Sequence, residues 1–343
     1  MNHLANWIRR HQIVAFFIIT FAITWGLGFS WSAVLQRGHA LLLPLAFVSV
    51  CGPGLAGIII STVTNTQPKH GTRKTFWIAF LVAWFGVSLV CFANLIFIEQ
   101  FPLSPVVAIL FTFSVIPVAF VLASARSRNP SVRNYLASLI MLRGVWGWTL
   151  LALVLFPALH LISFPINSLI DRQARLPYQF PDISLVLIGL IVVKFLYQFF
   201  FFNATGEETG WRGFALPRLQ KKTCPLVAAL VIAFFWVPWH LFGWQAEGKP
   251  VLSLQYWGIM YTGHILLSIL IVWIFNRAKG NILVAGVTHA AANTVQAFIP
   301  VQRIWSLYLT LFVAVLVLIL VDRMWKKLPP DHPAVYQTPV MAG

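Results

Sequence analysis

Six polar residues in the second half of the chain have types and spacing that acid–base chemistry, such as hydrolysis, could use. Hydrolysis needs a base to activate water and hydrogen-bond donors to stabilise the charge that develops on the carbonyl oxygen. A pair of adjacent carboxylates lies upstream of two histidines, and the second histidine is followed four residues later by an asparagine. The candidate catalytic residues are Glu207, Glu208, Arg212, His240, His289 and Asn293.

The two carboxylates lie between apolar stretches of a chain that has only eight Asp and Glu residues. Charges held against a membrane segment are costly and usually serve function. A structural alternative also fits, because Thr205 and Glu208 form a capping-box pattern and Glu208 can pair with Arg212 on a helix. Residues 206–220 would then be a capped amphipathic helix at the membrane interface. This alternative leaves Glu207 without a partner.

The two histidines stand in apolar segments, where either could be a structural hydrogen-bonding group. His240 follows Pro238, which is expected to kink its helix. His289 and Asn293 are four residues apart, so their side chains lie on one helix face. The three alanines between them allow close helix packing. We expect a structural or cavity-lining role for five other polar residues in apolar segments, His160, Asn167, Lys194, Gln198 and His264.

The composition places these residues in a membrane. Of the 343 residues, 59% are hydrophobic and 9% are charged, whereas a soluble domain carries roughly 25% charged residues. One globular core could not bury so much apolar sequence, so the bilayer is the expected solvent. The net charge of +16 would suggest nucleic acid in a soluble protein. Here the basic residues separate apolar runs, as topology signals do, and we expect no nucleic-acid partner.

The chain is predicted to be an all-α polytopic membrane protein, a bundle of about 8–10 transmembrane helices. Eighteen of the 24 Lys and Arg residues fall on one side of the membrane if the segments alternate from a cytoplasmic N-terminus. This asymmetry predicts that both termini are cytoplasmic. The expected location of the protein is the cell membrane. The expected apolar segments are 13–35, 41–63, 76–97, 104–125, 147–170, 184–203, 223–244, 255–276, 282–300 and 304–321.

We divide the chain into N-terminal transmembrane helices at 1–184, a catalytic core at 185–300, a final transmembrane helix at 301–327 and a disordered tail at 328–343. One difficulty follows from straight spans. Glu207 would lie near the cytoplasmic end and His240 near the outer end, roughly 20–30 Å apart at ~1.5 Å per residue. We therefore expect residues 206–220 to enter the membrane, or the seventh span to end later than residue 244.

The patterns Glu207-Glu208-x-x-x-Arg212, Trp236-x-x-x-His240 and His289-x-x-x-Asn293 resemble, in order, the motif series of the CPBP family. These are the CAAX proteases and bacteriocin-processing enzymes, also called the Abi family. Trp236 stands where that family usually has Phe, which keeps an aromatic ring. The resemblance covers roughly residues 185–300 and implies a CAAX-protease-like core.

The resemblance implies an intramembrane endopeptidase that hydrolyses a peptide bond of a membrane-associated protein or peptide, in CAAX-type or leader-type processing. Glu207 would be the general base, His240 would hold the same water, and His289 and Asn293 would donate to the oxyanion. Glu208 and Arg212 would form an ion pair that fixes the motif helix.

Two versions of this mechanism remain open. The preferred one needs no cofactor, because the chain has no H-E-x-x-H motif and Asn is a poor zinc ligand. In the other, Glu207, His240 and His289 bind zinc, which acidifies the water.

Two functions from other classes are also compatible with the sequence. A proton-coupled transporter could use Lys194, Glu207, His240 and His289 as a relay, although no inverted repeat is visible. A catalytically inactive family member could act as a membrane scaffold or immunity factor. The expected partners are membrane lipid and a membrane-anchored substrate. Substrate identity and oligomeric state are left open.

Overall fold

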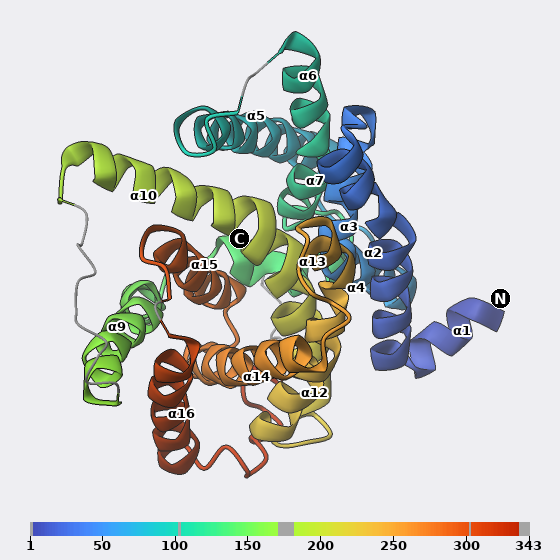
Figure 1. The fold of residues 1–343 in the computed structure, drawn as a ribbon. Coiled ribbons are helices and arrows are strands. Elements are labelled where there is room, and N and C mark those ends of the chain that lie inside the picture. The colour runs from blue at the N-terminus through green and yellow to red at the C-terminus, as the bar shows by residue number, and fades with distance from the viewer. Residues whose placement is uncertain (1–2, 102–103, 171–181, 302, 336–343) are drawn as a thin grey trace.

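A computed structural model describes residues 3–101, 104–170, 182–301 and 303–335, and within these ranges the chain is helical and forms no strand (Figure 1). The elements are α1 (His3–Arg10), α2 (Gln12–Arg37), η1 (Ala40–Leu42), α3 (Leu43–Val50), α4 (Gly52–Thr64), α5 (Arg73–Phe97), α6 (Pro105–Ser114), α7 (Ile116–Ser124), α8 (Pro130–Leu136), η2 (Ala137–Ile140), α9 (Trp146–Ile170), α10 (Leu185–Tyr197), η3 (Gln198–Ala215), α11 (Leu216–Gln220), α12 (Pro225–Trp239), α13 (Leu241–Ala246), α14 (Leu254–Arg277), α15 (Ile282–Phe298) and α16 (Ile304–Val321).

Eight helices or unbroken helical runs in the described residues are long and apolar enough to cross a membrane. A ninth candidate is the pair Ala40–Val50 and Gly52–Thr64, which is bent by 57°. α15 is apolar but shorter. Each of the ten segments expected from the sequence is therefore helical, and the prediction of an all-α polytopic membrane protein is confirmed.

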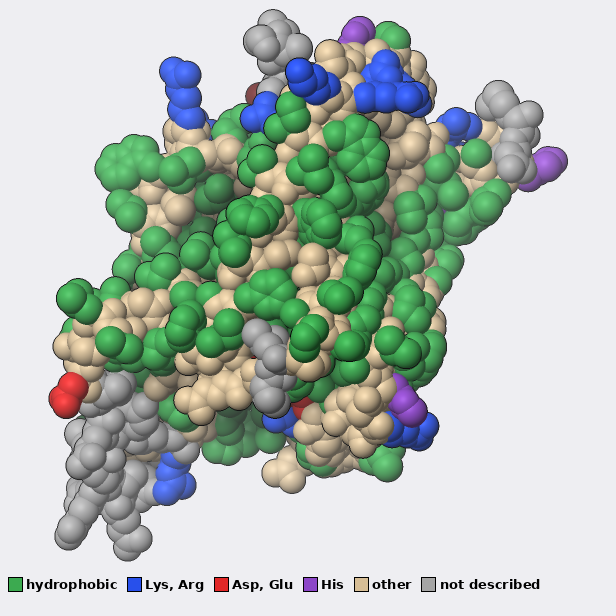
Figure 2. All heavy atoms as spheres, turned by 90° about the horizontal axis from the view of Figure 1, so that it is seen from above, with side chains coloured by type: hydrophobic (Ala, Val, Ile, Leu, Met, Phe, Trp, Pro, Cys, Tyr) green, Lys and Arg blue, Asp and Glu red, His purple; other side chains and the backbone are tan. Residues whose placement is uncertain are grey.

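The outer surface has the character of a lipid-facing one. Large apolar side chains are exposed along α5 and α10, among them Val82, Phe85 and Val186. Figure 2 shows hydrophobic side chains over the middle of one face, with Lys and Arg gathered mainly toward its upper edge. This distribution is the reverse of a soluble protein's and matches a bundle dissolved in a bilayer.

The sixth span differs from its prediction. α10, η3 and α11 form one unbroken helical run, Leu185–Gln220, so residues 206–220 belong to the span and are not a separate interfacial helix. Thr205 is not a helix cap, because its hydroxyl donates to the carbonyl of Phe200 inside η3. η3 is a π-helix. This form is rare in proteins, and where it occurs it is often part of a functional site. The polar residues of η3 are tolerated in the membrane because neighbouring helices bury them.

Small residues let the backbones around η3 approach closely. η3 packs against α4 on one side and α15 on the other. Gly210 lies against Pro53 so closely that an added Cβ would be 2.3 Å from the proline Cβ. Gly286 of α15 meets Ala204 in the same way. Close approach of helices at small residues is the usual basis of packing in membranes.

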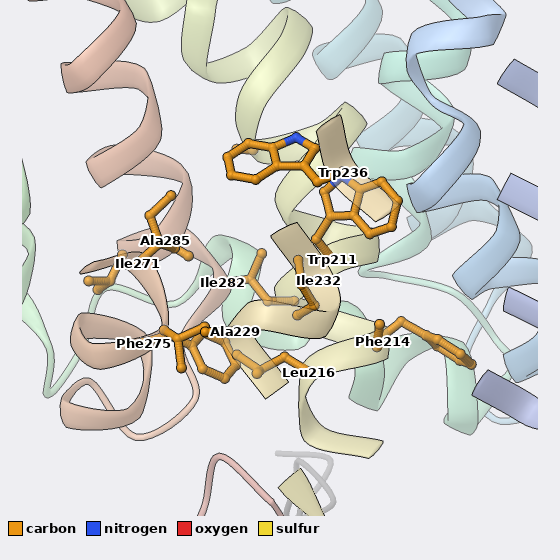
Figure 3. Packing of buried hydrophobic residues seen from close by; sticks show 14 of the residues in the cluster. Trp211, Phe214, Leu216, Ala229, Ile232, Trp236, Ile271, Phe275, Ile282 and Ala285 are labelled. Atoms are coloured by element: carbon orange, nitrogen blue, oxygen red, sulfur yellow. The ribbon is translucent and has the colours of Figure 1, made fainter. Parts of the chain in front are cut away.

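The apolar core lies on the side of η3 that faces α11, α12 and α14. Figure 3 shows Leu216, Ile232 and Phe275 close together, whereas Phe214 lies apart and stacks on Phe16 of α2. α15 also contacts α9, α10 and α14, and Figure 1 shows it surrounded by these helices. η3 and α15 are thus held from several sides, which fixes the polar residues that they carry.

The C-terminal boundary needs a correction. Residues 328–335, expected to be part of a disordered tail, are packed against the bundle, and Ala334 and Val335 are buried. Gln220 donates to the carbonyl of Ala334 at 3.2 Å, which satisfies a backbone acceptor that would otherwise need water. Residues 336–343 of the predicted tail lie outside the described residues.

Candidate active site

The helices η3, α11 and α12 follow one another along the chain and bring Glu207 and His240 to the same depth in the bundle. Glu207 precedes the end of α11 at Gln220 by 13 residues, and His240 follows the start of α12 at Pro225 by 15 residues. The two helices are joined by residues 221–224 and run in opposite directions. Similar distances from the connection place Glu207 beside His240. The separation expected from straight spans does not arise, because the sixth span is longer than drawn.

Glu207 is buried and held by two donors. Its Oε2 accepts from Trp236 Nε1 at 2.6 Å, and its Oε1 accepts from Asn203 Nδ2 at 3.3 Å. His240 Nε2 lies 3.9 Å from Glu207 Oε2. This separation is too long for a direct hydrogen bond and suits two groups that contact one water. A carboxylate has about four lone-pair sites, so Glu207 keeps acceptor capacity for that water.

Glu208 points to a different, dry environment. Its Oε1 accepts from Arg212 Nη1 at 2.8 Å and is 2.9 Å from His289 Nδ1, and the carboxylate and the guanidinium are fully buried. The expected ion pair is present, and His289 joins it. The Arg212 guanidinium lies 4.4 Å from the centre of the Trp236 ring, a cation–π contact. Glu208 Oε2, Arg212 Nε and Arg212 Nη2 make no hydrogen bond with the described residues.

His240 presents its Nε2 to the site. Its Nδ1 is 2.9 Å from the carbonyl of Trp236, which fixes a proton on Nδ1. Nε2 of the neutral ring is then an acceptor. The ring stacks on Trp244, with centroids 4.8 Å apart and planes within 7°. These contacts fix both the tautomer and the orientation of the imidazole.

Two residues of the site were missed or undervalued in the sequence. Asn203 donates to Glu207 and accepts from Asn293 Nδ2 at 3.3 Å, so it links η3 to α15. Its position four residues before Glu207 was a usable signal. His264 of α14 lies 5.1 Å from His240 between ring centroids. Nothing in its surrounding sequence connects it to the motifs.

Two cavities meet at the same side chains. The α2-side cavity, of about 320 Å³, is bordered by Thr24, Gly28 and Trp31 of α2 together with α13. The α14-side cavity, of about 350 Å³, is bordered by helices α9, α14, α15 and α16. The residues that border both are Glu207, His240, Trp244 and Asn293. His264 and His289 border only the α14-side cavity.

The candidate zinc ligands do not form a metal site in this arrangement. Among the described residues, no three His, Cys, Asp or Glu side chains are placed so that they could hold one ion. The Nδ1 atoms of His289 and His240 are engaged by Glu208 and by a backbone carbonyl, contacts that leave Nε2 of each ring available and therefore do not bear on metal binding. Since the described residues offer no such set of ligands, we derive no chemical step through a metal.

Four of the other polar residues named from the sequence lie apart from the catalytic cluster or at its margin. Lys194 pairs with Glu99 at 2.7 Å and borders neither cavity. His160 Nε2 is 2.8 Å from the carbonyl of Ile299, and Asn167 accepts from Ser306. Gln198 borders the α2-side cavity.

Comparison with known proteins points to one kind of enzyme. Residues 190–295 match a family model described as type II CAAX prenyl endopeptidase Rce1-like. The chain is also similar to the protein named CAAX prenyl protease 2 of Methanococcus maripaludis, with 28% identity over 127 residues. That alignment covers 35% of this chain and 47% of the relative, so the chain spans about half the length of this relative. All six candidate catalytic residues fall inside the matched family segment.

Proposed function

The chain belongs to the CAAX protease family through residues 190–295, and on that premise we propose that it hydrolyses a peptide bond of a membrane-anchored substrate within the bilayer. One observation carries this proposal. Glu207 Oε2 and His240 Nε2 lie 3.9 Å apart at the border of two cavities, the spacing for a shared water.

In the proposed reaction, the water held by Glu207 and His240 attacks the scissile carbonyl carbon and transfers one proton to Glu207. Asn293 Nδ2 and His289 stabilise the oxyanion of the tetrahedral intermediate. The carbon–nitrogen bond then breaks, and the leaving nitrogen takes the proton from Glu207. Since His289 Nδ1 is directed at Glu208, His289 donates from Nε2 only as an imidazolium, which the Glu208 carboxylate stabilises.

Glu208 and Arg212 act as positioning residues in this scheme. Neither borders the two cavities, and both are fully buried. Glu208 orients His289 across the interface between η3 and α15, while Arg212 neutralises Glu208 and stacks on Trp236.

The proposed substrate is a peptide with a lipid-anchored C-terminus, as the name of the Methanococcus relative suggests for that protein. Apolar and aromatic side chains border both cavities beside the carboxylate, which suits a substrate that arrives from the membrane. A leader-type membrane peptide is the second candidate substrate. The termini are proposed to be cytoplasmic, in the cell membrane, because Arg9, Arg10, Lys221 and Lys222 gather at one end of the bundle.

The test uses purified protein in proteoliposomes with a farnesylated C-terminal peptide and, separately, an unlipidated leader-type peptide, with the products identified by mass spectrometry. Glu207→Gln is expected to abolish cleavage while the protein stays folded. Glu99→Gln is the matched control, since Glu99 is a carboxylate paired with Lys194 outside both cavities. Undiminished cleavage by Glu207→Gln would refute the assignment of the base. Proton-coupled uptake without cleavage would favour a transporter.

Metal content gives an independent test of the cofactor-free mechanism. Elemental analysis of purified wild-type protein is expected to show much less than one zinc per chain, and activity is expected to survive dialysis against a chelator. Stoichiometric zinc that disappears in His240→Ala would overturn this version and favour the zinc-bound one.

A further inference from the structure

A third cavity, here called the basic cavity, lies at the end of the bundle where α1, α4, α8 and α11 meet. Its volume is about 580 Å³, and it shares no bordering residue with the two catalytic cavities. Five side chains that carry a positive charge border it, and no carboxylate of the described residues does. These are Arg9, Arg10, Arg218, Lys221 and Lys222.

The charge in this cavity is not neutralised within the described part of the chain. None of the five basic side chains forms an ion pair there, whereas Lys194, Arg212 and Arg277 each pair with a carboxylate. Like charges that share a concave surface repel one another and raise the local concentration of anions. The cavity therefore attracts a ligand that carries negative charge.

The donor groups are held ready for such a ligand. The Arg218 guanidinium stacks on Phe214 and is fixed by Nε donating to Gln12 Oε1 and Nη1 donating to the Phe214 carbonyl. Its Nη2 makes no hydrogen bond with the described residues. Ser61 borders the same cavity, is 2% exposed, and its buried hydroxyl has no partner among the described residues.

An unpartnered buried hydroxyl is costly and marks a position where a ligand can complete the hydrogen bonding. Arginine, lysine and hydroxyl donors around one concavity are the groups that recognise phosphate oxygens.

The surroundings of the cavity place it at the level of lipid headgroups. α1 exposes Leu4 and Trp7 and buries Ile8 in the bundle, as an interfacial helix does. Val14 borders the cavity and is itself half exposed. Basic donors beside an exposed apolar surface match an anionic phospholipid, whose phosphate would enter the cavity while its acyl chains lie along the bundle.

From this geometry we propose that the basic cavity is a binding site for a phosphate group, with an anionic phospholipid headgroup as the source. The site stands independently of the protease assignment, because none of its residues takes part in the proposed reaction.

Native mass spectrometry of the full chain in neutral detergent tests the site. Titration with phosphatidylglycerol is expected to give one saturable adduct, with at least tenfold weaker binding of phosphatidylcholine. Lys221→Ala/Lys222→Ala is expected to weaken the adduct by about tenfold or more, since each Lys near an anionic headgroup contributes about 1 kcal/mol. Ser61→Ala, which removes the buried donor without removing charge, is expected to weaken it by a smaller factor.

Lys326→Ala/Lys327→Ala is the matched control, because these two exposed lysines do not border the cavity. Their loss should leave the adduct unchanged. Equal weakening by both double variants would overturn the proposal, because it would show diffuse attraction to the membrane surface. Inorganic phosphate and glycerol phosphate are added as competitors in separate arms. Competition by either at low concentration supports the phosphate site with a soluble source, and lipid binding without competition supports the lipid source. Absence of binding by all probes overturns the site.

Discussion

The buried Glu208–Arg212 pair gives the sharpest prediction about how the site is held. Glu208→Gln keeps the shape of the side chain and removes its charge. Arg212 is fully buried, and Glu208 supplies its only ion pair among the described residues. Two of its nitrogens already lack a hydrogen-bond partner in the part of the chain that the structure describes. The substitution therefore removes the carboxylate that pairs directly with a buried arginine charge and leaves only the more distant Glu207 carboxylate to act on it.

The expected cost follows from this burial. Removing one partner of a buried ion pair destabilises a protein by about 3–5 kcal/mol, because the other charge remains desolvated. At about 2–3 °C per kcal/mol, the midpoint of thermal unfolding should fall by about 6–15 °C. A second loss should appear in catalysis. A neutral amide stabilises the His289 imidazolium less than a carboxylate does, by about 1.4 kcal/mol or tenfold in kcat.

Thermal denaturation in detergent, followed by size-exclusion fluorescence, and cleavage assays separate the two effects. In Glu208→Gln/Arg212→Met both charges are absent, so the thermal midpoint should recover while kcat stays low. A Glu208→Gln protein with wild-type midpoint and wild-type kcat would refute the reasoning. Recovery of kcat in the double variant would show that Glu208 serves stability alone and does not act on His289.

Three further predictions concern the supports of the site and the C-terminal segment. Trp236→Phe removes the 2.6 Å bond to Glu207 and should lower kcat by about tenfold while the protein stays folded. Gly210→Ala should destabilise the protein by about 1–3 kcal/mol or more, because the new Cβ would overlap Pro53. Burial lowers the pKa of His332, so the unfolded chain takes up a proton first and stability should fall as the pH drops through the ordinary histidine pKa of 6.5.

Each of these predictions has a control of the same chemistry. Trp239→Phe removes an indole donor to Thr24 and leaves Glu207 untouched. Gly189→Ala adds a Cβ that meets nothing within 4 Å. His332→Asn should reduce the loss of thermal stability on acidification, and an unchanged pH profile would contradict the role given to His332. An equal loss in kcat for Trp236→Phe and Trp239→Phe would count against the role given to the bond between Trp236 and Glu207. Equal thermal midpoints for Gly210→Ala and Gly189→Ala would count against the close approach of Gly210 to Pro53.

The helices were predictable because apolar runs of about 20 residues have one stable state in a bilayer. The convergence of Glu207, His240 and Asn293 was expected from their spacing and from the family pattern. Residues 206–220 were expected to enter the membrane, but their continuation of the sixth span as one unbroken helical run was not predicted. Hydropathy counts Thr205 and Glu208 as polar, whereas burial depends on the helices that surround them, and sequence periodicity does not reveal those neighbours.

Other features depended on contacts between distant parts of the chain. His264 belongs to none of the three motifs, so only packing of α14 against α12 shows that it approaches His240. The end of the described chain was predicted to be disordered from its prolines, yet Gln220 holds Ala334. The basic cavity combines α1 with residues more than 200 positions away.

The convergence of two cavities on Glu207, His240 and Asn293 has a consequence for inhibition. A small molecule bound in either the α2-side or the α14-side cavity would contact the same carboxylate, Glu207. Two chemically unrelated inhibitors, one in each cavity, would therefore each compete with the proposed substrate. If a linker passed beside the side chains that both cavities share, the second contact would become an intramolecular one, and the joined compound would then bind far more tightly than its halves.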